Sequence, residues 1–232
     1  MKDQLSFLLT KSITENIMWF MPPINNYVLS AAKGNEVDNK QKKLRSLVIL
    51  GLMTAAVFAS NYIQFVIPTP IGATRIHIAN GICLLSALLM GGFKGGISAG
   101  LGSFLFDLTF PEYVATSWVT FIMKFLMALI CGFVVHISGK DNTGSGISVL
   151  RKIVGAVIGS VSYVVMYIAK QFIEQCLILG LSVQAVAITT FTVKLPASLI
   201  NAALAVPIAV LLHSALYPAL KKAGLSDLFG IK

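Results

Sequence analysis

Two lysines lie inside stretches of the chain that are otherwise apolar. Lys124 lies in "SWVTFIMKFLMALICG" and Lys194 lies in "TTFTVKLPASLINAAL". A charged side chain inside the hydrocarbon of a membrane costs about 2.5 to 3.5 kcal/mol, so a retained one usually faces a cavity or a partner. The segment "TPIGATRIHIAN", residues 69–80, adds Arg75 and His77, two residues apart between apolar stretches. The chemistry that these groups offer is the non-covalent binding of a polar molecule.

Further polar and aromatic side chains are candidates for the same binding site. Those of residues 163–174 are spaced three, four and seven residues apart, which places them on one side of a helix. Asn201 is seven residues past Lys194 and shares its face. Trp118 is interpreted either as an interfacial anchor or as the aromatic wall of a pocket. We therefore expect a polar, partly aromatic cavity formed by Arg75, His77, Asp107, Trp118, Lys124, Tyr163, Tyr167, Lys170, Gln171, Glu174, Lys194 and Asn201.

The alternative is a set of buried ion pairs, such as Lys124 or Lys194 with Asp107, that serves only packing. The cavity is favoured because basic groups outnumber acidic ones among these residues. The sequence has no GxxxxGK[ST] loop for ATP, no HExxH motif or histidine cluster for a metal, and no GxSxG nucleophile turn. Its cysteines, Cys83, Cys131 and Cys176, lie singly in apolar segments. We therefore expect neither an enzyme nor a metal or cofactor site.

The composition of the chain is that of a membrane protein. Of its 232 residues, 56% are hydrophobic and 12% are charged, and the mean hydropathy is +0.82. A soluble domain needs more polar residues than this to cover its surface. The 18 lysines and arginines exceed the 9 acidic residues, but they lie in short clusters between apolar segments. That pattern is typical of cytoplasmic loops and argues against nucleic-acid binding.

Six apolar segments must position the polar groups. Their lengths are near the roughly 20 residues that a helix needs to cross a bilayer. The basic clusters beside these segments fall on one face, which the positive-inside rule makes cytoplasmic. We therefore expect an all-α integral membrane protein: a six-helix transmembrane bundle with both termini cytoplasmic and the polar groups toward its outer half. The predicted spans are residues 46–67, 77–92, 95–110, 116–137, 150–174 and 186–217.

Two parts of this bundle have special features. The second and third spans are short and share the turn "MGGFKGGISAG", so they are either two helices or one buried hairpin. The last span contains Pro196 and Pro207, which are expected to kink it or to mark where it leaves the bilayer.

The predicted domain organisation has three parts. Residues 1–45 form an N-terminal cytoplasmic or interfacial extension, because Pro22 and Pro23 leave its apolar patch too broken to span. Its alternative is a misassigned start, with the functional chain beginning at Val37. Residues 46–217 form the six-helix substrate-binding domain, and residues 218–232 form a cytoplasmic tail.

A stripe of small residues runs along the first span. Gly51, Ala55 and Ala59 recur every four residues, with Ala56 and Ser60 beside them. Small residues let helix backbones approach closely in lipid. On spacing alone, packing within the bundle is favoured over docking to a partner.

The run "RIHIANGICLLSALLMGGFKGGISAGLGSFLFDL", followed by "IMKFLMALICG", resembles the S components of energy-coupling factor (ECF) vitamin transporters. The resemblance is to the branch named for riboflavin, hydroxymethylpyrimidine and pyridoxine uptake, and it covers about residues 44–215. Its markers are His77, the Gly-rich turn, Asp107 and Lys124. Where the branch usually has an acidic residue shortly after the histidine, this chain has Asn80, which joins the candidate binding residues.

The resemblance implies a six-helix membrane subunit that binds its vitamin near the outer face. It also implies docking of the first-helix stripe onto a transmembrane coupling subunit driven by two ATPases, in the bacterial cytoplasmic membrane. The loop with Arg75 and His77 would then be a cationic lid that favours a ligand with an acidic or electron-rich group.

The expected function is therefore that of a substrate-binding subunit of an ECF-type importer. Pyridoxine, hydroxymethylpyrimidine and pantothenate rank ahead of riboflavin, because only two tryptophans are available to grip a flavin. The alternative is a stand-alone carrier or channel that needs no ATPase.

Overall fold

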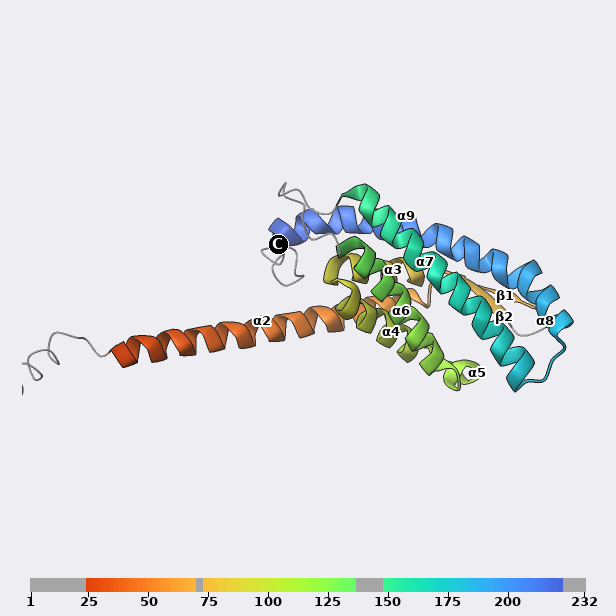
Figure 1. Ribbon diagram of the computed structural model, residues 1–232, viewed down its shortest axis with the longest axis horizontal. Helices are drawn as coiled ribbons and strands as arrows, with labels where there is room; N and C mark the ends of the chain where they lie inside the picture. Colours follow the sequence, from red (N-terminus) through yellow and green to blue (C-terminus); the bar gives the residue numbers. More distant parts are fainter. Residues whose placement is uncertain (1–23, 70–72, 137–147, 223–232) are drawn as a thin grey trace, which may run out of the picture. The chain divides into compact units, whose positions relative to one another are not determined.

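The computed structural model describes residues 24–69, 73–136 and 148–222, which are mostly helical. The chain divides into two units, Met1–Arg45 and Ser46–Lys232, and the second contains the helical bundle. The elements in chain order are α2 (Ile24–Ser60), β1 (Gln64–Pro68), β2 (Ala73–His77), α3 (Ala79–Met90), α4 (Gly92–Asp107), α5 (Pro111–Val114), α6 (Ser117–His136), α7 (Val149–Phe172), the π-helix η1 (Ile173–Ile178), α8 (Val183–Thr189), the π-helix η2 (Thr190–Lys194) and α9 (Leu195–Lys222) (Figure 1).

Four helical stretches are long and apolar enough to cross a membrane: Lys43–Ser60, Ser117–His136, Val149–Ile178 and Val183–Lys222. The apolar helix Ala79–Met90 is shorter. These lengths agree with the predicted membrane-spanning class, whereas the count of six spans and the cytoplasmic termini stay predictions. The proline pair before α2 and the tail beyond Lys222 lie outside the described residues, and the alternative start at Val37 stays a prediction.

Helix α3 is short, and its neighbours in the bundle bury it. At about 1.5 Å per residue it is about 18 Å long, less than the roughly 30 Å of a hydrocarbon layer. All of its residues except Ile82 are buried, and α4, α6 and α9 pack against it. Gly91 ends the helix with a φ of 79°, a conformation that favours glycine, and α4 follows at once. Residues 77–110 therefore contain two helices.

Glycines bring α4 and α6 into close contact. A methyl group on Gly132 would lie 2.3 Å from the Cα of Gly92, and one on Gly100 would lie 2.8 Å from the ring of Phe121. These glycines therefore pack inside the bundle. Dispersion contacts between closely spaced backbones stabilise helix pairs where lipid supplies no hydrophobic force.

Replacing Gly132 by alanine is expected to destabilise the protein by about 1–3 kcal/mol, because the obstructing atoms belong to backbone and cannot rotate away. Thermal unfolding in detergent measures this as a lowered midpoint. The matched control is Gly51→Ala, since no described atom lies within 4 Å of a methyl group there. Equal midpoints for the two variants would show that α6 can shift away from α4.

The predicted first span is wrong at its end. Helix α2 stops at Ser60, and the side chain of Asn61 donates a hydrogen bond of 2.8 Å to the carbonyl of Val57 in the last turn. The chain then forms the antiparallel pair β1–β2, in which Gln64 is opposite His77 and Val66 is opposite Arg75. The β-branched residues of "QFVIP" suit a strand, and their apolar character extended the predicted span.

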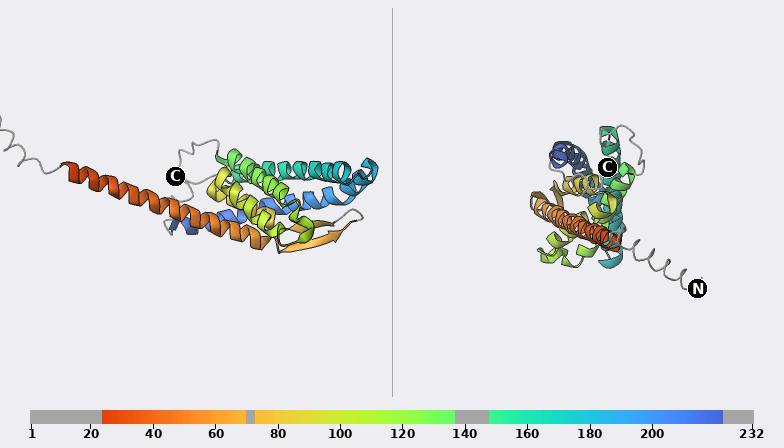
Figure 2. Two further views of the ribbon diagram at one scale, coloured as in Figure 1. Left: turned by 90° about the horizontal axis from the view of Figure 1, so that it is seen from below. Right: turned by 90° about the vertical axis from the view of Figure 1, so that its left-hand side faces the viewer.

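The hairpin lies at one end of the bundle. Figures 1 and 2 show β1, β2, α5 and α8 together at this end, while α9 ends at Lys222 at the other. Helix α9 contacts β2, and α8 follows the turn after η1. Pro196, which cannot donate a backbone hydrogen bond, is the second residue of α9, just after the π-helix η2 ends at Lys194. Pro207 lies inside α9, and the predicted kink there stays a prediction.

Candidate functional site

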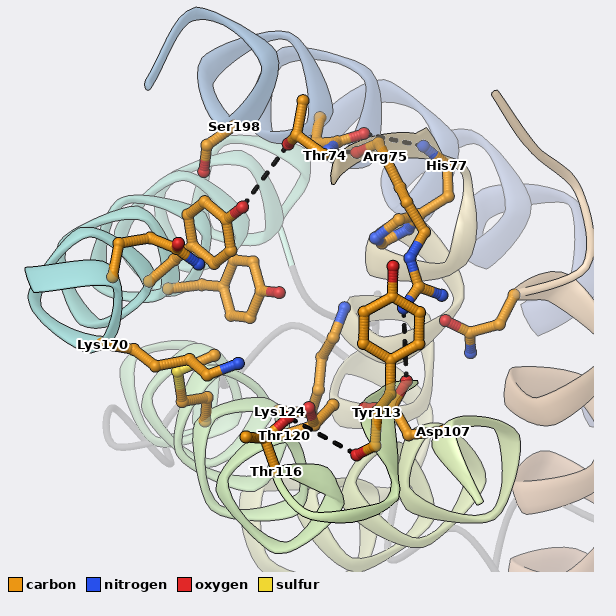
Figure 3. A pocket seen from close by; sticks show the side chains of 16 residues that line it. Thr74, Arg75, His77, Asp107, Tyr113, Thr116, Thr120, Lys124, Lys170 and Ser198 are labelled. Carbon is orange, nitrogen blue, oxygen red and sulfur yellow. Dashed lines mark hydrogen bonds and ion pairs between the residues drawn. The ribbon is translucent and has the colours of Figure 1, made fainter. Parts of the chain in front are cut away.

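A cavity of about 120 Å³ lies at this end of the bundle. The strand β2, the ends of α4 and α7, the start of α9 and the helices α5 and α6 all contribute to its wall (Figure 3). Its lining residues are Asn61, Thr74, Arg75, His77, Asp107, Tyr113, Thr116, Thr120, Met123, Lys124, Tyr163, Tyr167, Lys170, Gln171, Ser198 and Asn201.

Arg75 is held on one side of the cavity by an ion pair and an aromatic ring. Its guanidinium lies 3.8 Å from the carboxylate of Asp107 and donates a hydrogen bond of 3.3 Å to Gln64. Its central carbon lies 3.7 Å from the centre of the Tyr113 ring, a cation–π contact. Thr120 forms a side-chain hydrogen bond with Asp107. The ion pair of Asp107 among the described residues is with Arg75, and none joins it to Lys124 or Lys194.

Lys124 rises from α6 into the middle of the cavity (Figure 3). It is only 2% exposed, donates a hydrogen bond to the side-chain oxygen of Asn80, and lies 4.6 Å from the centre of the Tyr163 ring. Tyr163 and Tyr167 stack with their ring centres 6.3 Å apart. No carboxylate of the described residues forms an ion pair with Lys124.

Two polar atoms of the cavity wall have no hydrogen-bond partner among the described residues. They are Nδ1 of His77 and Oγ of Ser198, and both are buried. Burial, followed by the positive charges of Lys124 and Arg75, lowers the pKa of His77 well below its usual value of 6.5. The imidazole is therefore neutral near pH 7, and both atoms are buried polar atoms beside the cavity for which the described residues supply no partner.

Nine of the predicted site residues line the cavity, and four do not. Trp118 is 61% exposed and donates to the carbonyl of Ala115, so the pocket-wall interpretation is wrong. The other three support lining residues: Asn80 accepts from Lys124, Glu174 lies 3.3 Å from Lys170, and Lys194 donates a bond of 2.5 Å to Gln171. The nine that line it are Arg75, His77, Asp107, Lys124, Tyr163, Tyr167, Lys170, Gln171 and Asn201.

Seven lining residues were not predicted, and for three of them the sequence carried a signal. Thr116 and Thr120 precede Lys124 by eight and four residues, which places all three on one face of a helix. Ser198 lies between Lys194 and Asn201 on their shared face. The other four are Asn61, Thr74, Tyr113 and Met123. The described residues contain no group of three or more His, Cys, Asp or Glu that could hold a metal ion.

The small-residue stripe faces outward for most of its length. Ala55, Ala56 and Ala59 are exposed, and so is Gly51. Ser60 is buried and donates a hydrogen bond of 2.8 Å to the carbonyl of Val57, so its assignment to a docking surface is wrong. The opposite face packs on α4, where a methyl group on Gly102 would lie 2.6 Å from the carbonyl oxygen of Thr54.

Comparison with known proteins identifies the family. The chain matches the family described as ECF-type riboflavin transporter, S component, over residues 41–218. A solved structure, titled "Structure and mechanism of the S component of a bacterial ECF transporter", is 17% identical with a TM-score of 0.54, and the match covers 77% of this chain and 99% of that one. No curated protein matches the chain. The membrane-helical fold of the S components is therefore shown, and the chain belongs to the family of ECF-type riboflavin transporter S components, the substrate-binding subunits of membrane transporters.

Proposed function

We propose that the protein captures a small vitamin or vitamin precursor with an acidic or electron-rich oxygen at the outer face of the bacterial cytoplasmic membrane. The observation that carries this proposal is the charge balance of the cavity. Asp107 offsets Arg75 and Glu174 offsets Lys170, whereas Lys124 has no carboxylate partner among the described residues. An acidic group on a ligand would complete the pairing of Lys124 in a site shielded from water.

The size and walls of the cavity favour a small ring-shaped ligand. A water molecule needs about 10–15 Å³ of cavity volume, so a cavity of 120 Å³ holds roughly ten waters. The volume of these waters is close to that of one molecule of pyridoxine or hydroxymethylpyrimidine. The stacked pair Tyr163 and Tyr167 offers an aromatic wall to a flat ring. Pantothenate offers the acidic group without the ring. Riboflavin, which the family description names, is larger than these vitamins and ranks behind them for a cavity of this size.

Delivery into the cell is proposed to require a transmembrane coupling subunit and two ATPases, as S components of ECF transporters use. Two observations support this part of the proposal. The sequence has no ATP-binding loop of its own, and Gly51, Ala55, Ala56 and Ala59 of the stripe are exposed. A stand-alone carrier would also lack an ATP-binding loop, but it would not need the exposed stripe.

Mass spectrometry of small molecules released from the purified protein tests the proposed ligand class. After expression in rich medium we expect about one equivalent of a vitamin with an acidic or electron-rich oxygen. Recovery of riboflavin would retain the binding function and reject the size argument. An empty protein that also shows no thermal shift with these vitamins would reject the ligand class, and full uptake in cells that lack the coupling subunit and ATPases would favour the stand-alone carrier.

A further inference from the structure

Asn201 of α9 forms two hydrogen bonds to the backbone of β2. Its side-chain nitrogen donates to the carbonyl of Arg75 at 2.7 Å, and its side-chain oxygen accepts from the amide of His77 at 2.8 Å. The side chain is 6% exposed, and its partners lie more than 120 residues away in the chain, at separations of 126 and 124. Both ends of the amide are therefore engaged by one strand.

These two bonds occupy the edge of β2 that β1 leaves free. In a strand, the carbonyl of one residue and the amide of the residue two positions later point to the same side. Arg75 and His77 stand in that relation, and the carboxamide of Asn201 offers one donor and one acceptor, as a peptide group of a neighbouring strand would. Asn201 thus takes the place of a third strand, in a hairpin whose two strands alone would be marginally stable in water.

Apart from its pairing with β1, the other side-chain contacts between β2 and the helices are longer. The hydroxyl of Thr74 lies 3.4 Å from that of Tyr167 on α7, and the guanidinium of Arg75 lies 3.8 Å from Asp107 on α4. The two short bonds from Asn201 are made to the backbone of the same two residues whose side chains carry the cationic and imidazole groups of the cavity wall.

We propose that Asn201 is a positioning residue that fixes β2 against α9, so that the side chains of Arg75 and His77 are held at the cavity. Asn201 lines the cavity, and both its amide nitrogen and its amide oxygen bond to the strand, so we assign its effect on a ligand to β2. This inference rests on the proposed function for its effect on ligand binding, but the fixing of the strand is a property of the empty protein.

Hydrogen–deuterium exchange of the ligand-free protein in detergent tests the inference. Asn201→Leu removes both bonds at similar volume, and we expect residues 73–78 to exchange roughly ten- to hundredfold faster, because two hydrogen bonds are lost. Exchange in α6 and α7 should not change. The control is Ser198→Ala, one turn earlier on α9, which alters the same cavity wall at an atom that has no partner among the described residues.

Unchanged exchange of residues 73–78 in Asn201→Leu would overturn the inference. If that variant does not fold, Asn201→Ala replaces it, and loss of protection throughout α6 and α7 in both variants would also overturn it, because Asn201 would then stabilise the bundle as a whole. Binding of pyridoxine and riboflavin by the same variants separates this inference from the proposed function. Faster exchange with no binding of either vitamin by the wild type supports the positioning role and counts against the ligand class alone.

Discussion

Replacing Lys124 by methionine is expected to weaken vitamin binding by roughly a hundredfold or more. Lys124 is the cation of the cavity wall without a carboxylate partner among the described residues, and it is almost fully buried. A ligand oxygen that bears negative charge would lose its counterion in a site that excludes water, where such a contact is worth several kcal/mol. Isothermal titration in detergent, with the vitamin recovered from the wild-type protein, measures the loss.

The substitution also leaves the side-chain oxygen of Asn80 without its donor, and this cost belongs to folding, not to binding. The double variant Lys124→Met with Asn80→Leu removes both partners, so its stability should return toward that of the wild type while binding stays lost. Lys152→Met is the matched control, because Lys152 is also a buried lysine of the bundle but does not line the cavity. Wild-type affinity in the Lys124 variant would make this lysine a packing residue and would remove the main support for an acidic ligand.

The membrane class and most helices could be predicted because long apolar segments can satisfy their backbone groups in lipid only as helices or closed barrels. The hairpin could not be predicted from the same property. Residues 64–68 are as apolar as the span before them, yet Asn61 closes the helix and the strand pairs with residues 73–77. Pairing between strands depends on the tertiary structure. Mean hydropathy does not distinguish a strand at the bundle end from the last turn of a transmembrane helix.

The residues of the candidate site likewise include some that the sequence could predict and some that it could not. Lys124 is conspicuous as a lysine inside an apolar segment, and Lys170 shares a helix face with Tyr163 and Tyr167; both lysines line the cavity. Lys194 carries the same signal but points to Gln171, since helical spacing defines a face and not the neighbour that the face meets. Tyr113 was missed because its role depends on Arg75 reaching across from the hairpin to stack on its ring. The ion pair between Arg75 and Asp107 likewise joins residues of two elements whose approach no local pattern records.

The exposed face of α2 concerns transport, as distinct from ligand binding, more directly than any other feature of the structure. Spacing alone favoured packing of the stripe within the bundle, but Ala55 and Ala59 are exposed while Val57 and Ser60, on the other side of the same helix, are buried. One helix face cannot pack on α4 and be exposed at once. In lipid, a flat exposed face of small residues is suited to close approach by a helix from another subunit.

Ala55→Trp and Ala59→Trp are therefore each expected to reduce vitamin uptake to background while vitamin binding in detergent stays within about twofold of the wild type. An indole on this face would hold a partner helix away from the backbone by several ångströms, and packing contacts fall off steeply over such a distance. Uptake of labelled vitamin by cells that express the coupling subunit and the ATPases measures the first quantity, and titration of the purified protein measures the second.

Ala203→Trp is the matched control, because Ala203 is an exposed alanine on α9 and should tolerate the same added bulk in both assays. Loss of binding together with uptake in the α2 variants would mean that the stripe packs against the bundle in the membrane. Uptake at the wild-type level would mean that the partner docks elsewhere or that none is needed, which is the behaviour of a stand-alone carrier. Loss of uptake with binding intact separates capture from delivery, and it assigns delivery to a surface of α2 that takes no part in holding the ligand.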